Sequence, residues 1–218
     1  MKTNAPLILL FLFISSNFYG QGNHVFTTGE AANYGIIDLA TPGGQSWSTD
    51  RASLPGYFSA VMGATYTGGS DAANVNGYVK KYGNEVFAFP VGTGTDIRSV
   101  TINNTAGLGS DAFSLAWILG DPSGNLDPTT PNSGAHPITS VGPGIITVSP
   151  VGQWDWQVGD GGNLGTGTTG TGNGVGITVS IPDMSLFSIP LDLRLVGWNG
   201  TAWVDLSGSA TASGNTEN

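Results

Sequence analysis

The chain has 218 residues, with 15 acidic and 6 basic side chains, a formal net charge of −9 and no cysteine. This charge disfavours nucleic acid and anionic membranes as partners, because both are bound through basic patches. The absence of cysteine excludes disulfides, iron–sulfur clusters, Cys-type zinc sites and thiol nucleophiles. A hydrophobic content of 39% is enough for a packed core, and 35 glycines, about twice the usual share, indicate a chain rich in turns.

The first twenty residues have the pattern of a secretory signal peptide. Lys2 precedes an apolar run from Pro6 to Ile14, and the polar pair Ser15-Ser16 follows. The run is about half the ~20 residues that a membrane-spanning helix needs. We therefore expect cleavage at Gly20/Gln21, no membrane insertion afterwards, and an extracellular or cell-surface location.

After this segment, strand signals are many and helix signals are nearly absent. Short β-branched and aromatic runs alternate with glycine and proline, as in an all-β protein. The predicted strands are His24–Thr28, Tyr34–Ala40, Tyr57–Tyr66, Asn76–Lys81, Glu85–Pro90, Ile97–Asn103, Ala112–Leu119, Ile145–Ser149, Gln153–Val158, Val175–Ile181, Leu191–Trp198 and Ala202–Leu206.

Two turns predict hairpins. Gly83, between Tyr82 and Asn84, is free to take a positive φ and predicts a turn before the strand at Glu85–Pro90. The Asn199-Gly200 dipeptide is a favoured two-residue turn, and it predicts a hairpin that brings Trp198 close to Trp203.

These elements predict an antiparallel β-sandwich, either one sandwich or two sandwich-like halves. The halves are residues 21–119 and 145–218, and residues 120–144, which contain five prolines, form a long loop between them. The stretch Gly159–Gly174 is a Gly/Thr-rich segment of low complexity. Because no closing strand follows Leu206, we expect the second half to be truncated and the chain to be an N-terminal fragment.

Part of the chain resembles modules of large secreted surface proteins of Bacteroidota. The run VNGYVKKYGNEVFAFPVGTGTDIRSVTI, which begins at Val75, is similar to a segment that recurs there as a hairpin ending in a Phe-Pro-Val-Gly turn. The runs PVGQWDWQVGDGGN, VSIPD and LRLVGWNGTAWVDLSGSATASGNTEN resemble the second half of the same module. The resemblance implies a long, adhesin-like β-rich protein exported by the type IX route through a C-terminal sorting domain, which this sequence lacks. It brings no catalytic residues.

Catalytic constellations are sparse. The two histidines, His24 and His136, stand far apart, and there is no Gly-x-Ser-x-Gly elbow for a nucleophilic serine. Asp155 lies between Trp154 and Trp156 and is the best carboxylate for glycoside hydrolysis. Strand alternation, however, predicts two core tryptophans and a solvated Asp155 on the opposite face. We therefore expect no enzyme.

Two weak binding signals remain. Asp121, Asn125 and Asp127 place three oxygen donors in one loop, and Asp155, Asp160 and Asn163 offer a second cluster for calcium. Both clusters are also ordinary turn sequences, so we expect no cofactor, with calcium the one metal that has candidate ligands. Trp198 and Trp203, at the predicted hairpin, are the aromatics most expected to be exposed for stacking on sugars.

The sequence thus favours a non-enzymatic secreted or cell-surface module, structural or adhesive, of a longer exported protein. Its partner would be an unknown surface molecule or a glycan. A carbohydrate-binding module is the alternative, and a polysaccharide hydrolase is less favoured.

Overall fold

The computed structural model describes residues 22–40, 46–83, 85–104, 112–130, 132–158, 176–181 and 192–206. These residues form an all-β protein of several packed sheets, as the strand pattern predicts. No helix among them is long and apolar enough to cross a membrane. The predicted signal peptide and most of the Gly/Thr-rich segment lie outside the described residues.

The first nine strands form three successive coils of three short strands each. The first coil holds β1 (Asn23–Val25), β2 (Glu30–Asn33) and β3 (Ile36–Asp38); the second holds β4 (Trp47–Thr49), β5 (Tyr57–Ala60) and β6 (Thr65–Thr67); the third holds β7 (Val75–Asn76), β8 (Tyr78–Tyr82) and β9 (Phe87–Phe89).

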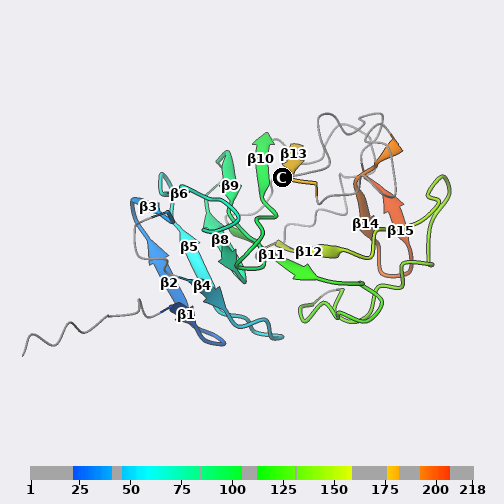
Figure 1. Cartoon of the computed structure of the whole chain (residues 1–218), viewed down its shortest axis with the longest axis horizontal. Coiled ribbons are helices and arrows are strands. Elements are labelled where there is room, and N and C mark those ends of the chain that lie inside the picture. The colour runs from blue at the N-terminus through cyan, green and yellow to red at the C-terminus, as the bar shows by residue number, and fades with distance from the viewer. Residues whose placement is uncertain are drawn as a thin grey trace, which may run out of the picture.

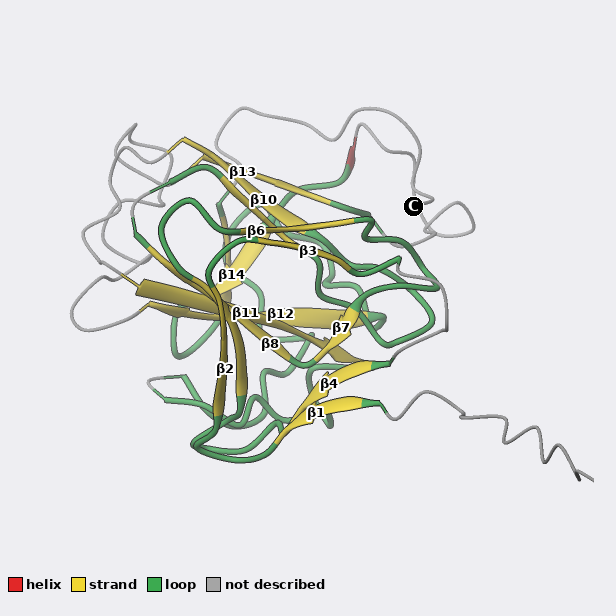
Figure 2. Cartoon of the chain, turned by 90° about the vertical axis from the view of Figure 1, so that its left-hand side faces the viewer, coloured by secondary structure: helices red, strands yellow, loops and turns green. Residues whose placement is uncertain are grey.

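Equivalent strands of successive coils lie side by side. The stacks β1–β4–β7, β2–β5–β8 and β3–β6 pair in parallel, and β9 packs next to β6. This is the arrangement of a short, three-sided β-solenoid, in which each coil contacts only its neighbours. Figure 2 shows the three stacks around a common interior.

Antiparallel strands extend two of these stacks. β11 (Ala112–Leu119) and β12 (Gly152–Val158) complete a five-stranded sheet in the order β12-β11-β8-β5-β2. β10 (Val100–Asn104) and β13 (Gly176–Val179) continue from β9. The hairpin of β14 (Val196–Trp198) and β15 (Trp203–Asp205) lies at the other end of the long axis from the first coil (Figure 1).

The core fills the space between the stacks. Val75, Val79, Phe89, Ile102 and Leu115 are completely buried, and they come from β7, β8, β9, β10 and β11. Burying each such side chain contributes about 1.5–3 kcal/mol. Both sides of the long 120–144 loop contribute strands to this one core, since β11 and β12 are paired along their whole length.

One corner of the solenoid depends on a glycine. Gly77 separates β7 from β8, and a Cβ at this position would overlap the side chain of Thr49. Thr49 can therefore reach the corner, where its Oγ1 accepts a hydrogen bond of 2.8 Å from the backbone N–H of Tyr78. The corner thus ties the third coil to the second.

A buried lysine fixes the turn between β5 and β6. Lys81 lies on the core side of β8, and its Nζ forms an ion pair of 2.6 Å with Glu85. The same Nζ donates to the carbonyl oxygen of Val61 at 2.8 Å. This turn, with Gly63 at φ 79°, divides the single strand predicted at Tyr57–Tyr66 into two.

Several pairing expectations are corrected. Antiparallel pairing holds between β8 and β11 and among β9 to β15, but not between the three coils, where the stacked strands are parallel. The hairpin predicted at Gly83 is wrong: Gly83 has a φ of 89°, but β8 and β9 belong to different sheets. Ile145–Ser149 is not a strand, since it forms part of the loop before β12. The hairpin at Asn199-Gly200 is confirmed, with Trp198 paired to Trp203.

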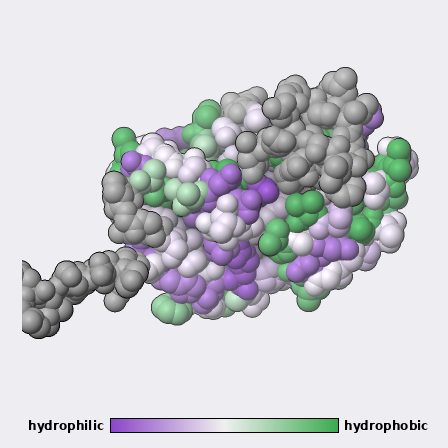
Figure 3. All heavy atoms as spheres, in the orientation of Figure 1, coloured by the Kyte–Doolittle hydropathy of each residue, from purple (hydrophilic) through white to green (hydrophobic). Residues whose placement is uncertain are grey.

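The first coil has open edges. β1, β2 and β3 each lie at the edge of their own sheet. Phe26 and Tyr34, which flank β1 and β2, and Ile36 of β3 are 71%, 81% and 73% exposed. On the face drawn in Figure 3, apolar residues form several separate patches among polar ones.

Candidate ligand-binding site

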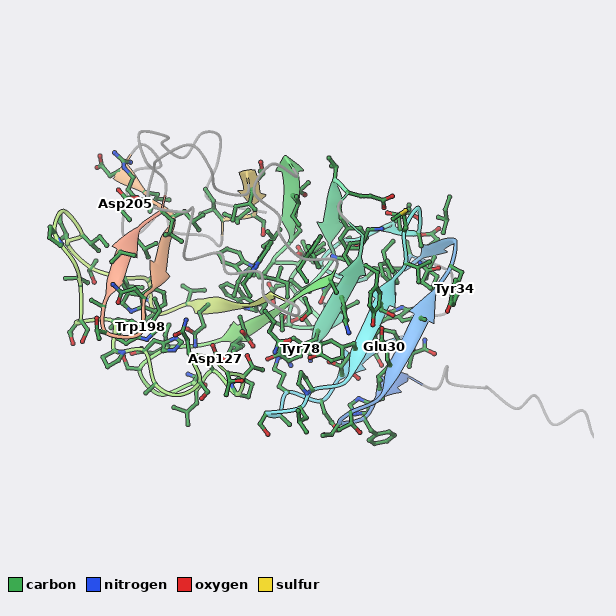
Figure 4. All side chains as sticks on the ribbon, turned by 180° about the vertical axis from the view of Figure 1, so that it is seen from behind. Glu30, Tyr34, Tyr78, Asp127, Trp198 and Asp205 are labelled. Carbon is green, nitrogen blue, oxygen red and sulfur yellow. The ribbon has the colours of Figure 1, made fainter. Side chains whose placement is uncertain are left out.

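A polar row crosses the outer face of the five-stranded sheet. Because side chains alternate along each strand, those of Lys80, Ser114 and Gln157 point away from the core, and they stand directly opposite one another on β8, β11 and β12. Tyr57 lies on the same face of β5, where it pairs with Tyr78, two residues before Lys80 on β8. Figure 4 shows this side, with Glu30, Tyr78 and Asp127 spread across it.

This row forms the floor of a pocket of about 230 Å³. Thr129 and Thr130, from the long loop between β11 and β12, form one wall. Ser53, Ala112 and Phe113 complete the lining. The proline-rich loop predicted at residues 120–144 therefore folds back onto the sheet and covers part of its polar face.

Hydrogen bonds orient the floor of the pocket. The carbonyl oxygen of the Gln157 side chain accepts from the Tyr57 hydroxyl at 2.9 Å and from the Ser114 hydroxyl at 2.6 Å. Both acceptor positions of this oxygen are then used, so the amide N–H groups are what Gln157 offers to a ligand. Burial raises the pKa of Tyr57, which keeps its hydroxyl protonated as a donor to Gln157.

Lys80 brings a positive charge to the pocket. Its Nζ lies over the rings of Tyr57 and Tyr82, at 5.0 and 4.6 Å from their centroids, and 3.6 Å from a carboxylate oxygen of Glu30. Burial lowers the pKa of Lys80, but the hydrogen bond with Tyr82 and the charge of Glu30 outweigh it, and the net shift is upward. Lys80 is therefore a cation at neutral pH.

Two carboxyl groups are buried beneath the threonine wall. Asp155 accepts hydrogen bonds on Oδ2 from the Tyr78 hydroxyl at 2.5 Å and from the Thr129 hydroxyl at 2.8 Å. Asp127 accepts from the backbone N–H of Thr129 at 2.8 Å. Burial, followed by the charge of Asp127, raises the pKa of Asp155 to about 7, and burial also raises the pKa of Asp127. The pair therefore retains a proton close to neutral pH.

The expectation that Asp155 is solvated is wrong, although the predicted alternation of side chains along β12 is correct. Trp154 and Trp156 pack against the core and Asp155 lies on the opposite face. That face is covered by the 120–144 loop, which leaves Asp155 only 5% exposed. Neither Asp155 nor Asp127 is among the described residues that line the pocket.

The calcium candidates serve as turn residues in this loop. Asp121 accepts a hydrogen bond from the backbone N–H of Ser123 at 2.8 Å, and the Asn125 amide donates to the Asp121 carbonyl at 3.0 Å. Asp127 is turned inward to the buried pair. In the described part of the chain, no three His, Asp or Glu side chains are grouped to hold a metal ion. Asp160 and Asn163 lie outside the described residues.

The tryptophans proposed for sugar stacking are packed inward. The ring of Trp198 stacks on His136 at a centroid distance of 5.0 Å, and Trp203 meets His136 edge-on at 5.9 Å. His136 is itself buried, with one ring nitrogen 2.8 Å from Gln153 and the other 2.6 Å from the Asn132 carbonyl. The expectation that Trp203 is exposed is wrong, since it is 6% exposed.

His24 contacts Ser48 and Asp50, two residues that the sequence analysis did not connect with it. In the parallel pair of β1 and β4, His24 stands opposite Ser48, and Nδ1 lies 2.8 Å from the Ser48 hydroxyl. Nε2 lies 3.0 Å from Oδ1 of Asp50. Two hydrogen bonds from Thr27 hold the Asp50 carboxylate and are the main cause of its lowered pKa. The three side chains follow the order of a Ser-His-Asp triad, but with the two ring nitrogens exchanged, since Nδ1 faces the serine and Nε2 the carboxylate. None of the three is among the described residues that line the pocket.

No protein-family model, curated protein or solved structure matches the chain. The assignment of a function therefore rests on the pocket, on the polar clusters around it and on the sequence pattern.

Proposed function

We propose that the chain is a non-enzymatic adhesion module of an exported cell-surface protein, and that it binds its partner through the pocket on the five-stranded sheet. The single observation that supports this most is the composition of the pocket. Among its described lining residues are a lysine, an amide, a tyrosine and four hydroxyl side chains, and no carboxylate. Such a lining can hold a polar ligand by hydrogen bonds but offers no acid–base pair for hydrolysis.

Two sequence patterns, one typical of export and one of surface proteins, support the same proposal. Residues 1–20 have the pattern of a secretory signal, and the runs beginning at Val75 resemble modules of secreted surface proteins. The partner is then a surface molecule or glycan, met outside the cell. The alternative, a carbohydrate-binding module attached to an exported enzyme, would use the same pocket.

Binding to an array of polysaccharides and cell-surface glycans tests the proposal. Thr130 is exposed at the pocket wall, so Thr130→Trp fills the pocket without removing a hydrogen bond of the floor. Ile146 is 97% exposed and lies outside the pocket, so Ile146→Trp is the matched control. We expect saturable binding that Thr130→Trp abolishes and Ile146→Trp preserves. Release of reducing sugar ends from a bound polysaccharide would contradict the non-enzymatic proposal.

One observation favours a second function, acyl hydrolysis at Ser48. The Ser48–His24–Asp50 contacts of 2.8 and 3.0 Å would let Nδ1 of His24 accept the serine proton while Asp50 orients the ring through Nε2, the reverse of the usual nitrogen assignment. A fluorophosphonate probe, which phosphonylates an activated serine, distinguishes the two functions. Labelling that Ser48→Ala and His24→Ala both remove would establish the hydrolase. Absence of labelling would leave the contacts as a link between β1 and β4.

A further inference from the structure

We propose that the ligand of the pocket is an acidic saccharide, a sugar that carries a carboxylate or a sulfate group. This inference rests on the proposed binding function and adds the chemical class of the ligand. It follows from which hydrogen-bonding groups of the pocket are already used and which remain.

The remaining groups are mainly donors. The acceptor oxygen of Gln157 is occupied by Tyr57 and Ser114, which leaves its two amide N–H groups. Lys80 has three N–H donors and no acceptor; Tyr82 takes one of them and Glu30 lies 3.6 Å away, which leaves donor capacity toward the pocket. The Thr129 hydroxyl is directed to the buried carboxyl groups. A ligand that fits this set has to present acceptor oxygens.

The charge of the pocket also favours a ligand with acceptor oxygens, and in particular an anionic one. Lys80 is the only cation in the described lining, and Glu30, its partner, contacts it at 3.6 Å from outside the pocket. No carboxylate in that lining repels an anion. The described lining thus carries one positive charge, which Glu30 offsets in part, and no negative charge. An anionic oxygen near Nζ gains a charge-assisted hydrogen bond, which is about twice as strong as a neutral one.

The size and rim of the pocket favour a sugar over a simple inorganic anion. A volume of about 230 Å³ is below the roughly 300–1,000 Å³ of pockets for drug-sized ligands, yet it exceeds what a bare anion needs. The exposed hydroxyl residues Ser53 and Thr130 lie at its rim. They can pair with the ring hydroxyls while Lys80 and Gln157 hold the acidic group.

Titrations of the full secreted chain with single sugars, followed by ligand-observed NMR, test the inference. The probes are glucuronate, glucose 6-sulfate, glucose and inorganic sulfate. We expect one or both acidic sugars to bind at least tenfold more tightly than glucose and than inorganic sulfate. The preference should fall with added salt, because it depends on a partly exposed charge. The two acidic sugars reveal which of the two anionic groups the pocket prefers.

Gln157→Glu is the sharpest variant. It keeps the oxygen that accepts from Tyr57 and Ser114, and it replaces the two amide donors by a negative charge. We expect at least a tenfold loss of acidic-sugar binding. Ile146→Glu adds the same charge at a residue that is 97% exposed outside the pocket, and it should bind like the wild type. Lys80→Gln should lose the preference for acidic over neutral sugars, and Lys80→Arg should retain it.

The outcomes separate this inference from the proposed function. Equal affinity for glucose and both acidic sugars would overturn the ligand class and leave the binding function in place. Inorganic sulfate binding as tightly as the sugars would overturn it as well, because the site would then recognise an anion alone. Array binding that Thr130→Trp abolishes, without a response to any of the single sugars, would also reject the acidic saccharide while the adhesion function stands.

Discussion

The hydroxyl of Tyr78 donates a hydrogen bond of 2.5 Å to the buried carboxyl of Asp155, and this contact joins the solenoid to its antiparallel extension. Tyr78 belongs to β8, the last strand of the β2–β5–β8 stack, whereas Asp155 belongs to β12, two strands away in the same sheet. Thr129 binds the same carboxylate oxygen from the covering loop. One carboxylate oxygen of Asp155 therefore connects the solenoid, its antiparallel extension and the covering loop.

The raised pKa of Asp155, about 7, makes stability depend on pH. The folded state retains a proton that the unfolded chain, with an ordinary pKa of 3.8, releases well below neutrality. The free energy of unfolding therefore falls as the pH rises, by on the order of 2 kcal/mol between pH 5 and pH 8. Asp155→Asn should remove most of this slope in melting curves, and Asp71→Asn, at an exposed carboxyl, should keep it. An equal slope in the wild type and Asp155→Asn would show that Asp155 does not hold the proton.

Substitutions of Lys81 and Glu85 should be strongly coupled in their effects on the free energy of unfolding. Glu85→Gln leaves the buried Lys81 ammonium without its carboxylate, so we expect a loss of about 1–2 kcal/mol, reduced from that of a fully buried pair because Glu85 is partly exposed. In a Lys81→Met background the same substitution should cost far less. Urea denaturation of the four proteins of this double-mutant cycle measures the coupling. Additive losses would mean that Glu85 stabilises the turn only through the backbone N–H of Gly63.

The start of β12 has no room for a side chain. A Cβ on Gly152 would overlap the ring of Trp117 and lie 2.6 Å from the carbonyl oxygen of Ile118. We expect Gly152→Ala to cost about 1–3 kcal/mol through overpacking. Gly124→Ala, where no atom lies within 4 Å of the new Cβ, is the control and should unfold at nearly the wild-type denaturant concentration.

The stacking of Trp198 on His136 predicts a structural role for this tryptophan. Trp198→Ala should lower the free energy of unfolding by about 1–3 kcal/mol, because it leaves His136 without its stacked ring. Trp198→Phe should recover part of this loss. Glycan binding should be the same in all three proteins, measured below their melting temperatures. A loss of binding in Trp198→Phe would instead place Trp198 in the glycan site.

Chelation should have little effect on stability. The carboxylates of Asp121 and Asp127 accept hydrogen bonds from the backbone N–H groups of Ser123 and Thr129, which satisfies them without a metal. The melting temperature should be the same with EDTA and with added calcium. A large rise with calcium, lost in Asp121→Asn, would make these residues ligands, because a metal that binds only the folded state stabilises it.

The sequence predicted the local elements better than their partners. The strand at Ala112–Leu119 and the hairpin at Asn199-Gly200 were predicted correctly, because alternation and turn chemistry are local signals. β2 was missed, since its sequence Glu-Ala-Ala-Asn has low strand propensity and it becomes a strand by pairing with β5. The parallel pairing of the coils was missed for a related reason. A strand that pairs with another strand one coil later has no sequence pattern of its own that indicates this partner.

The site was harder to predict than the fold. Lys80 and Ser114 come from strands that the sequence did predict, but their meeting depends on the register between β8 and β11. The burial of Asp155 depends on where the 120–144 loop packs, and nothing in a proline-rich sequence specifies the face that it covers. His24 and Ser48 meet only because β1 and β4 are parallel neighbours.

The parallel coils also set the order in which this protein can fold. Asn23 pairs with Trp47, and Ile36 pairs with Thr65, so each described strand of the first coil waits for a partner that is one whole coil away. Closing a local hairpin takes microseconds, but pairings this distant are slow because a long loop has to be closed first. A chain that emerges from its amino end therefore keeps β1, β2 and β3 unpaired until the second coil has followed. The export that we propose would benefit from this delay, because a chain without paired strands stays extended for translocation.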